Sequence, residues 1–327
     1  MQLLLKPDSI KADFLSMPPE EACGMSLLRN NSFILALALV AGVAVGHGAV
    51  YTRAAVTPLL AVIMTLSLVG VSSDVFRGGT RLVRPALLAL FLNYVLLGGV
   101  LMLLAFLLLD DTNLRAGYVL IAAVPPAVAV IPFTYKLGGD VPFTLVGSVA
   151  GHMAAFVLTP VITLLALGSS LVEPRQLVMA LLQLIALPFL VSRLLRRSQA
   201  VIRWLNAYRG ALLNWGFFVV VYTIIGLNRG ALMTFSPVLL RLGAISFIGT
   251  FGLAYTVYLA ARFAGATRQG RISYAVMGAW KNYGLAGAIA LVYFGEVAAL
   301  PAAVTTAFAI VNFIGLGMTI AVKPTAG

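Results

Sequence analysis

Apolar stretches about as long as a membrane-crossing helix follow one another along most of this chain. Of its 327 residues, 61% are hydrophobic and only 10% are charged, whereas a soluble domain carries about 25% charged residues. Such a chain has too few polar side chains to face water on all sides. The sequence therefore predicts an all-α protein embedded in a lipid bilayer. The acidic residues all lie between or beside the apolar stretches, at Asp8, Asp13, Glu20, Glu21, Asp74, Asp110, Asp111, Asp140, Glu173 and Glu296.

Charged segments and segments rich in proline or glycine divide the apolar sequence into ten expected transmembrane spans of about 20 residues each. Two of these spans, the fourth and the ninth, are interrupted near the middle by polar or helix-breaking residues. The ten expected spans cover residues 32–50, 54–73, 85–109, 116–136, 141–168, 176–195, 210–228, 238–261, 272–294 and 297–321.

The distribution of Lys and Arg predicts the orientation of the chain. With a cytoplasmic N-terminus, most of the 22 Lys and Arg residues fall in segments that ten spans place inside, as the positive-inside rule requires. We therefore expect a multi-pass protein of the plasma (inner) membrane with both termini in the cytoplasm. Residues 1–31 carry both signs of charge and no clean apolar core, so we interpret them as a cytoplasmic leader and not as a signal peptide.

Two further features exclude other classes of protein. The net charge of +12 could suggest nucleic-acid binding, but that function needs a basic patch on a soluble module, and here the basic residues are scattered over short loops. Cys23, the single cysteine, precedes the first expected span. Intramolecular disulfides are therefore excluded, and cysteine-based metal or redox chemistry is not expected.

Ten spans also divide into two halves of five, residues 32–168 and 169–327, which then have opposite orientations. Inverted repeats of this kind are common in secondary transporters, with broken helices at equivalent positions in each half. The two interrupted spans occupy such equivalent positions. The segments that follow them, residues 135–142 and 293–301, also resemble each other weakly.

Three prolines break the pattern of the fourth span: Pro125, Pro126 and Pro132. Proline removes a backbone donor and clashes with the preceding turn, so this span cannot be one regular helix. One alternative is a simple kink. The other, favoured by three prolines within eight residues, is a helix break that faces a cavity, because irregular backbone inside a membrane needs protein or water beside it.

The fifth span carries Thr144, Ser148 and His152 at intervals of four residues, which places them on one face of a helix. Gly147 and Gly151 lie beside them and would let another helix approach closely. The hydroxyl groups could simply bond to carbonyls of their own helix, with His152 a satisfied interior imidazole. Alternatively, the three residues form a polar stripe that faces the break in the fourth span.

Lys281 lies near the middle of the ninth span. A lysine at the centre of a membrane helix costs about 2.5–3.5 kcal/mol on insertion scales, and such residues usually face a cavity or a partner. No acidic residue lies deep within any expected span, so the ammonium must find backbone dipoles, amide groups or an anionic substrate. Trp280 and Asn282 beside it supply an aromatic wall and an amide. The simpler alternative is that Lys281 extends to a lipid headgroup.

The remaining polar residues within spans include two single amides, Asn93 and Asn312, each of which could join helices or belong to a site. We find no catalytic set, no phosphate-binding loop and no spacing typical of metal ligands. The sequence therefore predicts a protein that is not an enzyme and that needs no cofactor.

Two segments resemble the signatures of the bile acid:sodium symporter family. Residues 124–142, with their proline break followed by Thr134, Tyr135 and a glycine, are similar to the signature of that family's fourth span. Residues 281–288 (Lys-Asn-Tyr-Gly-Leu-Ala-Gly-Ala), followed by Ala-Leu-Pro-Ala at 299–302, are similar to that of its ninth span.

The resemblance implies a five-plus-five inverted repeat in which spans 1, 2, 6 and 7 form a panel and spans 3–5 and 8–10 form a core. The broken fourth and ninth spans would cross within the core. A small organic anion, in that family usually accompanied by sodium, would bind between panel and core near the crossing.

Several residues at the family's sodium sites differ in this chain. Val130 and Ile131 stand in place of a Ser-Asn pair, Met277 in place of a Glu, and Lys281 in place of a Gln. The resemblance thus implies that the sodium sites are largely lost, so coupling to protons and no coupling are the two alternatives. Polar character remains at Thr144, Ser148, Asn282 and Asn93, the last at the position of a third-span Gln.

We hypothesise that the ammonium of Lys281 substitutes for a bound cation, either by holding the crossing together or by releasing a proton during the cycle. His152 is a second candidate for a titrating group. A secondary transporter of an organic anion is the function that these features favour. A facilitative, channel-like pathway and a membrane protein without transport activity are the alternatives, and nothing in the sequence favours a particular oligomeric state.

Overall fold

The computed structural model describes residues 31–69, 79–127, 129–168 and 174–319, and within these ranges the chain is helical, with no strand. Seven stretches are helical, long and apolar enough to cross a membrane. The chain is therefore a multi-pass membrane protein, as its composition predicts. The seven stretches are Phe33–Val69, Val83–Leu108, Val141–Leu167, Val178–Leu195, Ala207–Leu227, Pro237–Phe263 and Glu296–Thr319.

Seven is fewer than the ten spans expected from the sequence, for two physical reasons. The first two expected spans run together as one helical stretch of 37 residues, in which short 3₁₀ turns replace a loop. The fourth and ninth are each divided into two helices that are too short to qualify alone. The ten-span layout therefore remains a prediction.

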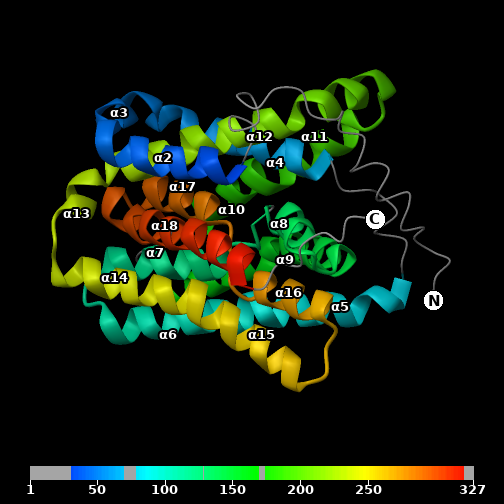
Figure 1. Cartoon of the computed structure of the whole chain (residues 1–327). Coiled ribbons are helices and arrows are strands. Elements are labelled where there is room, and N and C mark those ends of the chain that lie inside the picture. Colours follow the sequence, from blue (N-terminus) through cyan, green and yellow to red (C-terminus); the bar gives the residue numbers. More distant parts are fainter. Residues whose placement is uncertain (1–30, 70–78, 128, 169–173, 320–327) are drawn as a thin grey trace.

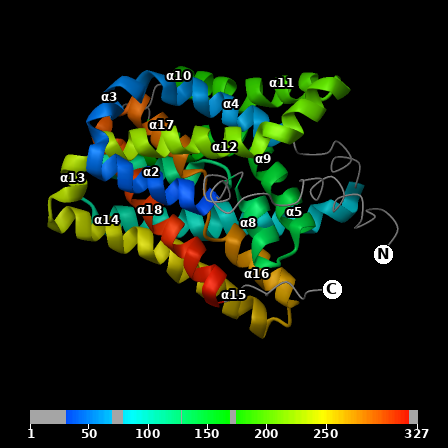
Figure 2. The same cartoon turned by 45° about the horizontal axis from the view of Figure 1, so that its top comes forward.

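One layer of the molecule consists of α2 (Asn31–Val45), α4 (Val56–Val69), α10–α11 (Pro174–Leu181 and Leu187–Leu195) and α12 (Gln199–Leu227). Figure 1 shows α2, α4, α11 and α12 of this layer along the upper side, and Figure 2 shows α2 and α12 side by side. A Cβ at Gly46, in the turn directly after α2, would come within 2.7 Å of the Cα of Gly226 on α12, so glycine allows the two backbones to touch there.

The second group of helices packs below this layer and contains both interrupted helices. Its uninterrupted members are α9 (Val141–Leu167) and α18 (Glu296–Thr319). Its other members are α5 (Val83–Leu90), α6 (Gly99–Leu108), α7 (Thr112–Ala123), α8 (Val130–Leu137), α14 (Pro237–Phe247), α15 (Leu253–Phe263), α16 (Arg268–Met277) and α17 (Tyr283–Tyr293).

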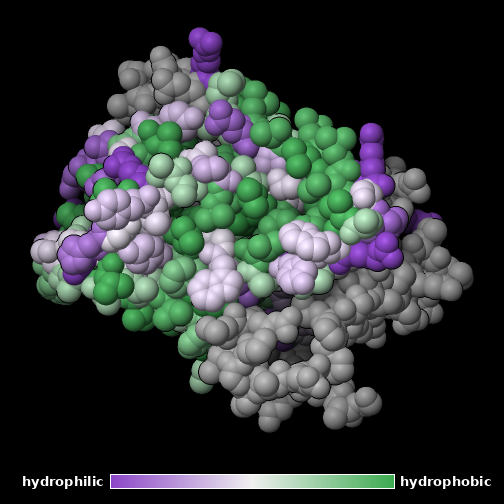
Figure 3. Space-filling model, turned by 90° about the horizontal axis from the view of Figure 1, so that it is seen from above, coloured by the Kyte–Doolittle hydropathy of each residue, from purple (hydrophilic) through white to green (hydrophobic). Residues whose placement is uncertain are grey.

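Short connections join these helices. They include the turns Gly46–Gly48, α3 (Ala49–Thr52) and Arg53–Ala55 between α2 and α4, the turn Gly79–Leu82 before α5, and α13 (Arg229–Met233) after α12. Figure 3 looks down on the side that is uppermost in Figure 1: apolar side chains cover its middle, and polar ones gather towards two ends. This distribution is the one expected of a surface that faces lipid between two aqueous sides.

The helix breaks occur where the sequence predicts them. Helix α7 ends at Ala123, and Val124 is extended, so the prolines produce a true break and not a kink. Pro132 falls in the first turn of α8, where a missing backbone donor costs nothing. In the ninth expected span, α16 ends at Met277 and α17 begins only at Tyr283.

Three helices also contain a π-helical segment: Phe91–Gly98 between α5 and α6, Leu182–Ala186 between α10 and α11, and Ile248–Gly252 between α14 and α15. Wide turns of this kind are rare and frequently occur at functional sites. The first of them carries Asn93 and Tyr94, both buried.

Candidate functional site

The two helix breaks lie against each other at the centre of the second group of helices. Pro126 and Lys281 form an antiparallel backbone bridge, and the N–H of Asn282 donates to the carbonyl of Pro125 at 3.0 Å. Segments that lie more than 150 residues apart in the sequence thus satisfy each other's backbone groups. This arrangement lets irregular backbone persist away from water, as the membrane environment requires.

Lys281 is fully buried at this crossing. Its Nζ donates to the carbonyls of Ala122 at 2.7 Å and Val124 at 3.0 Å, and lies 4.0 Å from the centre of the Tyr94 ring. The last carbonyls of a helix lack partners and carry the negative end of the helix dipole. The ammonium therefore binds the end of α7 and does not extend to a headgroup, and within the described residues its partners are backbone oxygens and a ring, not a carboxylate.

Asn93 performs a similar task at the other broken helix. From the π segment its Nδ2 donates to the carbonyls of Met277 and Trp280, both at 3.0 Å, and so satisfies the end of α16. The neighbouring Tyr94 donates its hydroxyl to the carbonyl of Gly151 on α9 at 2.9 Å. Asn93 thus joins helices at the crossing, while its Oδ1 is buried without a partner among the described residues.

Two more expected site residues flank Lys281. The side chain of Asn282 caps α17 by accepting from the N–H of Leu285 at 3.1 Å, and its amide contacts the sulfur of Met64 at 3.5 Å. Trp280 packs edge-on against Phe133, with ring centres 4.9 Å apart. Its indole N–H is buried and finds no acceptor within the described part of the chain.

The polar stripe on α9 is buried, and most of its bonds stay within that helix. Thr144 donates to the carbonyl of Val141 at 3.0 Å, and Nδ1 of His152 is 2.7 Å from the carbonyl of Ser148. These bonds are the ones that the simpler alternative predicts, in which polar side chains bond to carbonyls of their own helix. Nε2 of His152 is buried without a partner in the described ranges.

Glycines on α9 bring this stripe next to the break. A Cβ at Gly151 would lie 2.4 Å from Cδ of Pro126, and one at Gly147 would lie 2.8 Å from the terminal methyl of Met277. The stripe therefore packs beside both broken helices, as the second alternative predicts. Thr134 on α8 is also buried, and its hydroxyl has no partner among the residues described.

A cleft lies between the layer formed by α2 and α12 and the helix breaks. Lys281, Asn282 and Trp280 line one wall, and Ala129 stands at the start of α8. The other lining residues are mainly apolar: Leu35, Ala127, Phe133, Phe217, Val220, Val221, Ile224, Ile225, Tyr283, Gly284, Ala303, Thr306, Ala309 and Ile310. The sequence did not single out the α12 residues, because an apolar residue beside a cleft has the same pattern as one beside lipid.

The oxygen atoms at the crossing are poorly suited to a sodium ion. Carbonyls at the ends of α7 and α16 already accept from the ammonium of Lys281 and the amide of Asn93. Val130, Ile131 and Met277 offer no side-chain oxygen. Across the described residues there is also no group of His, Cys, Asp and Glu that could hold a metal ion. These residues therefore do not fit a hard cation, which needs a shell of oxygen ligands.

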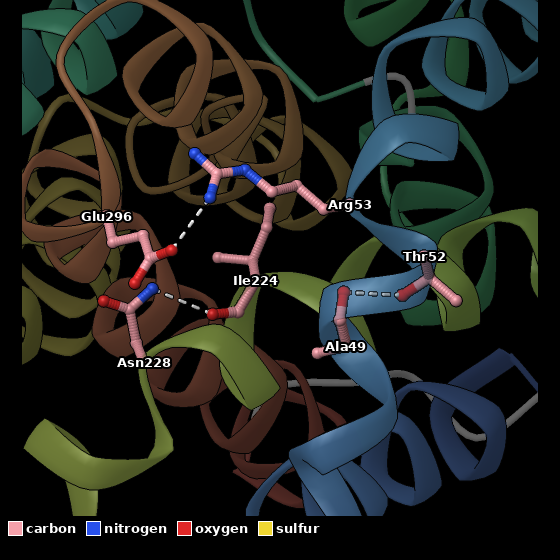
Figure 4. A network of polar contacts seen from close by, with 6 residues as sticks. All are labelled: Ala49, Thr52, Arg53, Ile224, Asn228 and Glu296. Atoms are coloured by element: carbon pink, nitrogen blue, oxygen red, sulfur yellow. Dashed lines mark hydrogen bonds and ion pairs between the residues drawn. The ribbon is translucent and has the colours of Figure 1, made fainter.

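One ion pair joins the two groups of helices at the end where α2 turns into α4. Nη1 of Arg53 lies 2.9 Å from Oε1 of Glu296, the first residue of α18, and both side chains are about half exposed. Figure 4 shows Arg53 reaching across to Glu296, while Thr52 beside it bonds back to Ala49, and Asn228 bonds to the Ile224 carbonyl within its own layer. Arg53 thus links the upper layer to the helices beneath it.

Comparison with known proteins supports the family resemblance. A family model described as the sodium bile acid symporter family matches residues 57–236, more than half of the chain. The match includes the first helix break and α12, which lines the cleft, and it ends before the second break. No curated protein matches the chain.

Proposed function

The chain belongs to the sodium bile acid symporter family, and from that membership we propose that it is a secondary transporter that moves a small organic anion by alternating access. Members of this family are transporters and not enzymes, and the sequence offers no catalytic set. The observation that carries the proposal is the cleft at the crossing of the two broken helices.

The substrate that this cleft suits is an anion with an apolar body. Helices α8 and α17 both begin at the cleft, at Ala129 and at Asn282. The N-terminus of a helix carries partial positive charge and free backbone donors, so two such ends favour a carboxylate or a similar group. The aliphatic side chains of α12 opposite them, such as Val220 and Ile224, would contact the apolar part of the substrate.

The transport cycle requires two bodies that move relative to each other. We assign α2, α4, α10–α11 and α12 to a panel and the remaining long helices to a core, in ten crossings with both termini in the cytoplasm. Two kinds of interruption support the repeat: the broken spans are the fourth and ninth, and two of the three π segments lie in the third and eighth, which are equivalent positions in two halves of five. Broken helices at equivalent positions are a feature of such transporters.

The coupling that we propose does not use sodium. Lys281 and Asn93 supply N–H donors to the carbonyls at the crossing. The ammonium of Lys281 therefore provides the positive charge that a bound cation would otherwise provide to these carbonyls. Two forms of the mechanism follow from this. Either Lys281 keeps its charge and transport is uncoupled, or Lys281, with His152 as the second candidate, exchanges a proton during each cycle.

The experiment that tests this proposal is uptake of labelled small organic anions into proteoliposomes, with sodium and proton gradients imposed separately. Accumulation driven by a pH gradient alone would support the proton-coupled form. Equilibration without accumulation would support the uncoupled form. Stimulation by sodium would contradict the assignment of Lys281 as the resident cation, and no uptake of any tested anion would contradict the substrate class.

A further inference from the structure

The first two turns of α12 are held against α4 by one face. Leu205 is buried against Leu66 and Val69 of α4, with Val201 and Ile202 packed beside them. This contact covers only one side of the helix, so side chains elsewhere on its circumference can be exposed.

Two aromatic side chains beside this contact are exposed. Trp204 and Tyr208 are 56% and 54% exposed, and their rings lie 5.3 Å apart, one turn from each other on the helix. Leu212 and Trp215 continue the same exposed stripe along α12. Their spacing of four, four and three residues keeps all four side chains on one face.

Two arginines precede this stripe in the sequence. Arg197, in the turn before α12, and Arg203, in its first turns, are both exposed, and neither forms an ion pair within the described residues. The chain has no Asp or Glu between Glu173 and Glu296. Positive charge is thus concentrated here without acidic residues nearby in the sequence.

The length of α12 places this patch at the membrane surface. Its 29 residues span about 43 Å, whereas the hydrocarbon core of a bilayer is about 30 Å thick. The apolar stretch of this helix that is suited to cross the membrane begins at Ala207, so the turns before it extend into the headgroup region, where Trp and Tyr are enriched. A guanidinium in that region can bind a phosphate through two parallel hydrogen bonds.

We propose that Arg197, Arg203, Trp204 and Tyr208 form a binding site for the headgroup of an anionic phospholipid. Its acyl chains would follow the stripe formed by Leu212 and Trp215. This stripe favours a lipid over free phosphate, because inorganic phosphate would make no use of exposed apolar surface. The site is independent of the proposed transport function, since it lies on the outer face of α12 and not in the cleft.

The test uses the full chain purified in detergent with equal amounts of phosphatidylglycerol and phosphatidylcholine, and native mass spectrometry counts the lipids retained. The wild-type protein should retain phosphatidylglycerol preferentially. Replacing both arginines (R197Q with R203Q) should weaken that binding about fivefold for each arginine. The matched control is R81Q with R84Q, which removes two exposed arginines near the start of α5.

The charge-retaining variant R197K with R203K should keep most of the preference, and circular dichroism should show unchanged helix content in every variant. The proposal is overturned if R197Q with R203Q retains phosphatidylglycerol like the wild type, or if the control loses it equally. Displacement of the lipid by millimolar inorganic phosphate would overturn the choice of ligand. A dimer that buries Trp204 in both copies would overturn the choice of partner.

Discussion

At the scale of single residues, the crossing depends on two side chains that donate to helix ends from a distance. Lys281 satisfies the last carbonyls of α7, and Asn93 satisfies those of α16. A buried carbonyl that loses its donor costs about 1–3 kcal/mol. Both residues therefore stabilise backbone that could not otherwise stay irregular inside the membrane.

The first prediction concerns the charge of Lys281. Lys281→Met should reduce uptake to background and remove any response to a pH gradient, because the carbonyls of Ala122 and Val124 lose their donor. Lys281→Arg separates the two forms of the mechanism. It keeps a permanent charge, so it should retain uptake if transport is uncoupled and lose it if the lysine must release a proton.

The transport rate of both variants and its pH dependence are measured as uptake into proteoliposomes at several external pH values. Unchanged pH-dependent transport in Lys281→Met would remove Lys281 from the mechanism. A thermal unfolding curve in detergent should accompany it, to separate lost transport from lost folding.

The second prediction compares two buried amides. Asn93→Leu removes donors from two carbonyls, so it should lower the free energy of unfolding by about 1–3 kcal/mol. Asn312→Leu is the matched control, because both amide atoms of Asn312 are buried and lack a partner among the described residues. This substitution should be neutral or stabilising, since it removes a polar group that nothing satisfies.

Thermal unfolding of both variants in the same detergent measures the difference. Equal destabilisation by the two substitutions would show that Asn93 contributes no more than any buried amide.

At the scale of elements, the broken helices keep their shape because a neighbouring helix packs directly against the break. Helix α9 approaches Pro126 through Gly151, where there is no room for a side chain. The two short helices on either side of each break are each too short to cross the membrane alone, because a spanning helix takes about 20 residues. Packing against α9 and α18, together with the donors described above, replaces what helix length cannot supply.

The third prediction tests this close contact. Gly151→Ala would place a methyl group 2.4 Å from the Pro126 ring, so it should destabilise the protein by about 1–3 kcal/mol and reduce uptake. Gly99→Ala on α6 is the matched control, because nothing lies within 4 Å of its added methyl group. There alanine should stabilise the helix by about 0.5–1 kcal/mol.

Midpoints of thermal unfolding and initial uptake rates provide the comparison. If Gly151→Ala has the same unfolding midpoint and uptake rate as Gly99→Ala, the close contact between α9 and the break contributes neither to stability nor to transport.

At the scale of the whole molecule, the two groups of helices that we propose as panel and core line the cleft together and are joined by the exposed pair of Arg53 and Glu296. An exposed ion pair contributes about 0–1 kcal/mol, so it can bias the position of two bodies without fixing it. That weakness suits a contact that must open and close if the two groups move relative to each other.

The fourth prediction tests that relative motion. In a background without its single cysteine (Cys23→Ser), a short bifunctional thiol reagent should abolish uptake when it joins cysteines at positions 53 and 296 (R53C with E296C). The control pair is T52C with T223C, because these two hydroxyls lie 2.6 Å apart within the panel. Cross-linking that pair should leave uptake unchanged.

Uptake before and after cross-linking, and after cleavage of a reducible reagent, gives the result. Full activity in the cross-linked 53–296 variant would contradict movement of panel against core at this end.

Much of this molecule follows from the sequence alone. Apolar stretches specify membrane helices because lipid offers no partner for polar groups. Three prolines specify a break because they remove backbone donors and clash with the preceding turn. A lysine far from any headgroup specifies an interior partner because an isolated charge is costly there. Local chemistry is sufficient for each of these conclusions.

The partners themselves were decided only by the tertiary structure. The carbonyls that bind Lys281 belong to Ala122 and Val124, and every residue has such a carbonyl, so no pattern distinguishes them. Asn93 and Asn312 look alike in sequence, yet only one meets a helix end. Ile224 faces the cleft and not lipid, and an aliphatic side chain suits both surroundings equally. Long-range packing resolves these choices, because it alone determines which surfaces meet.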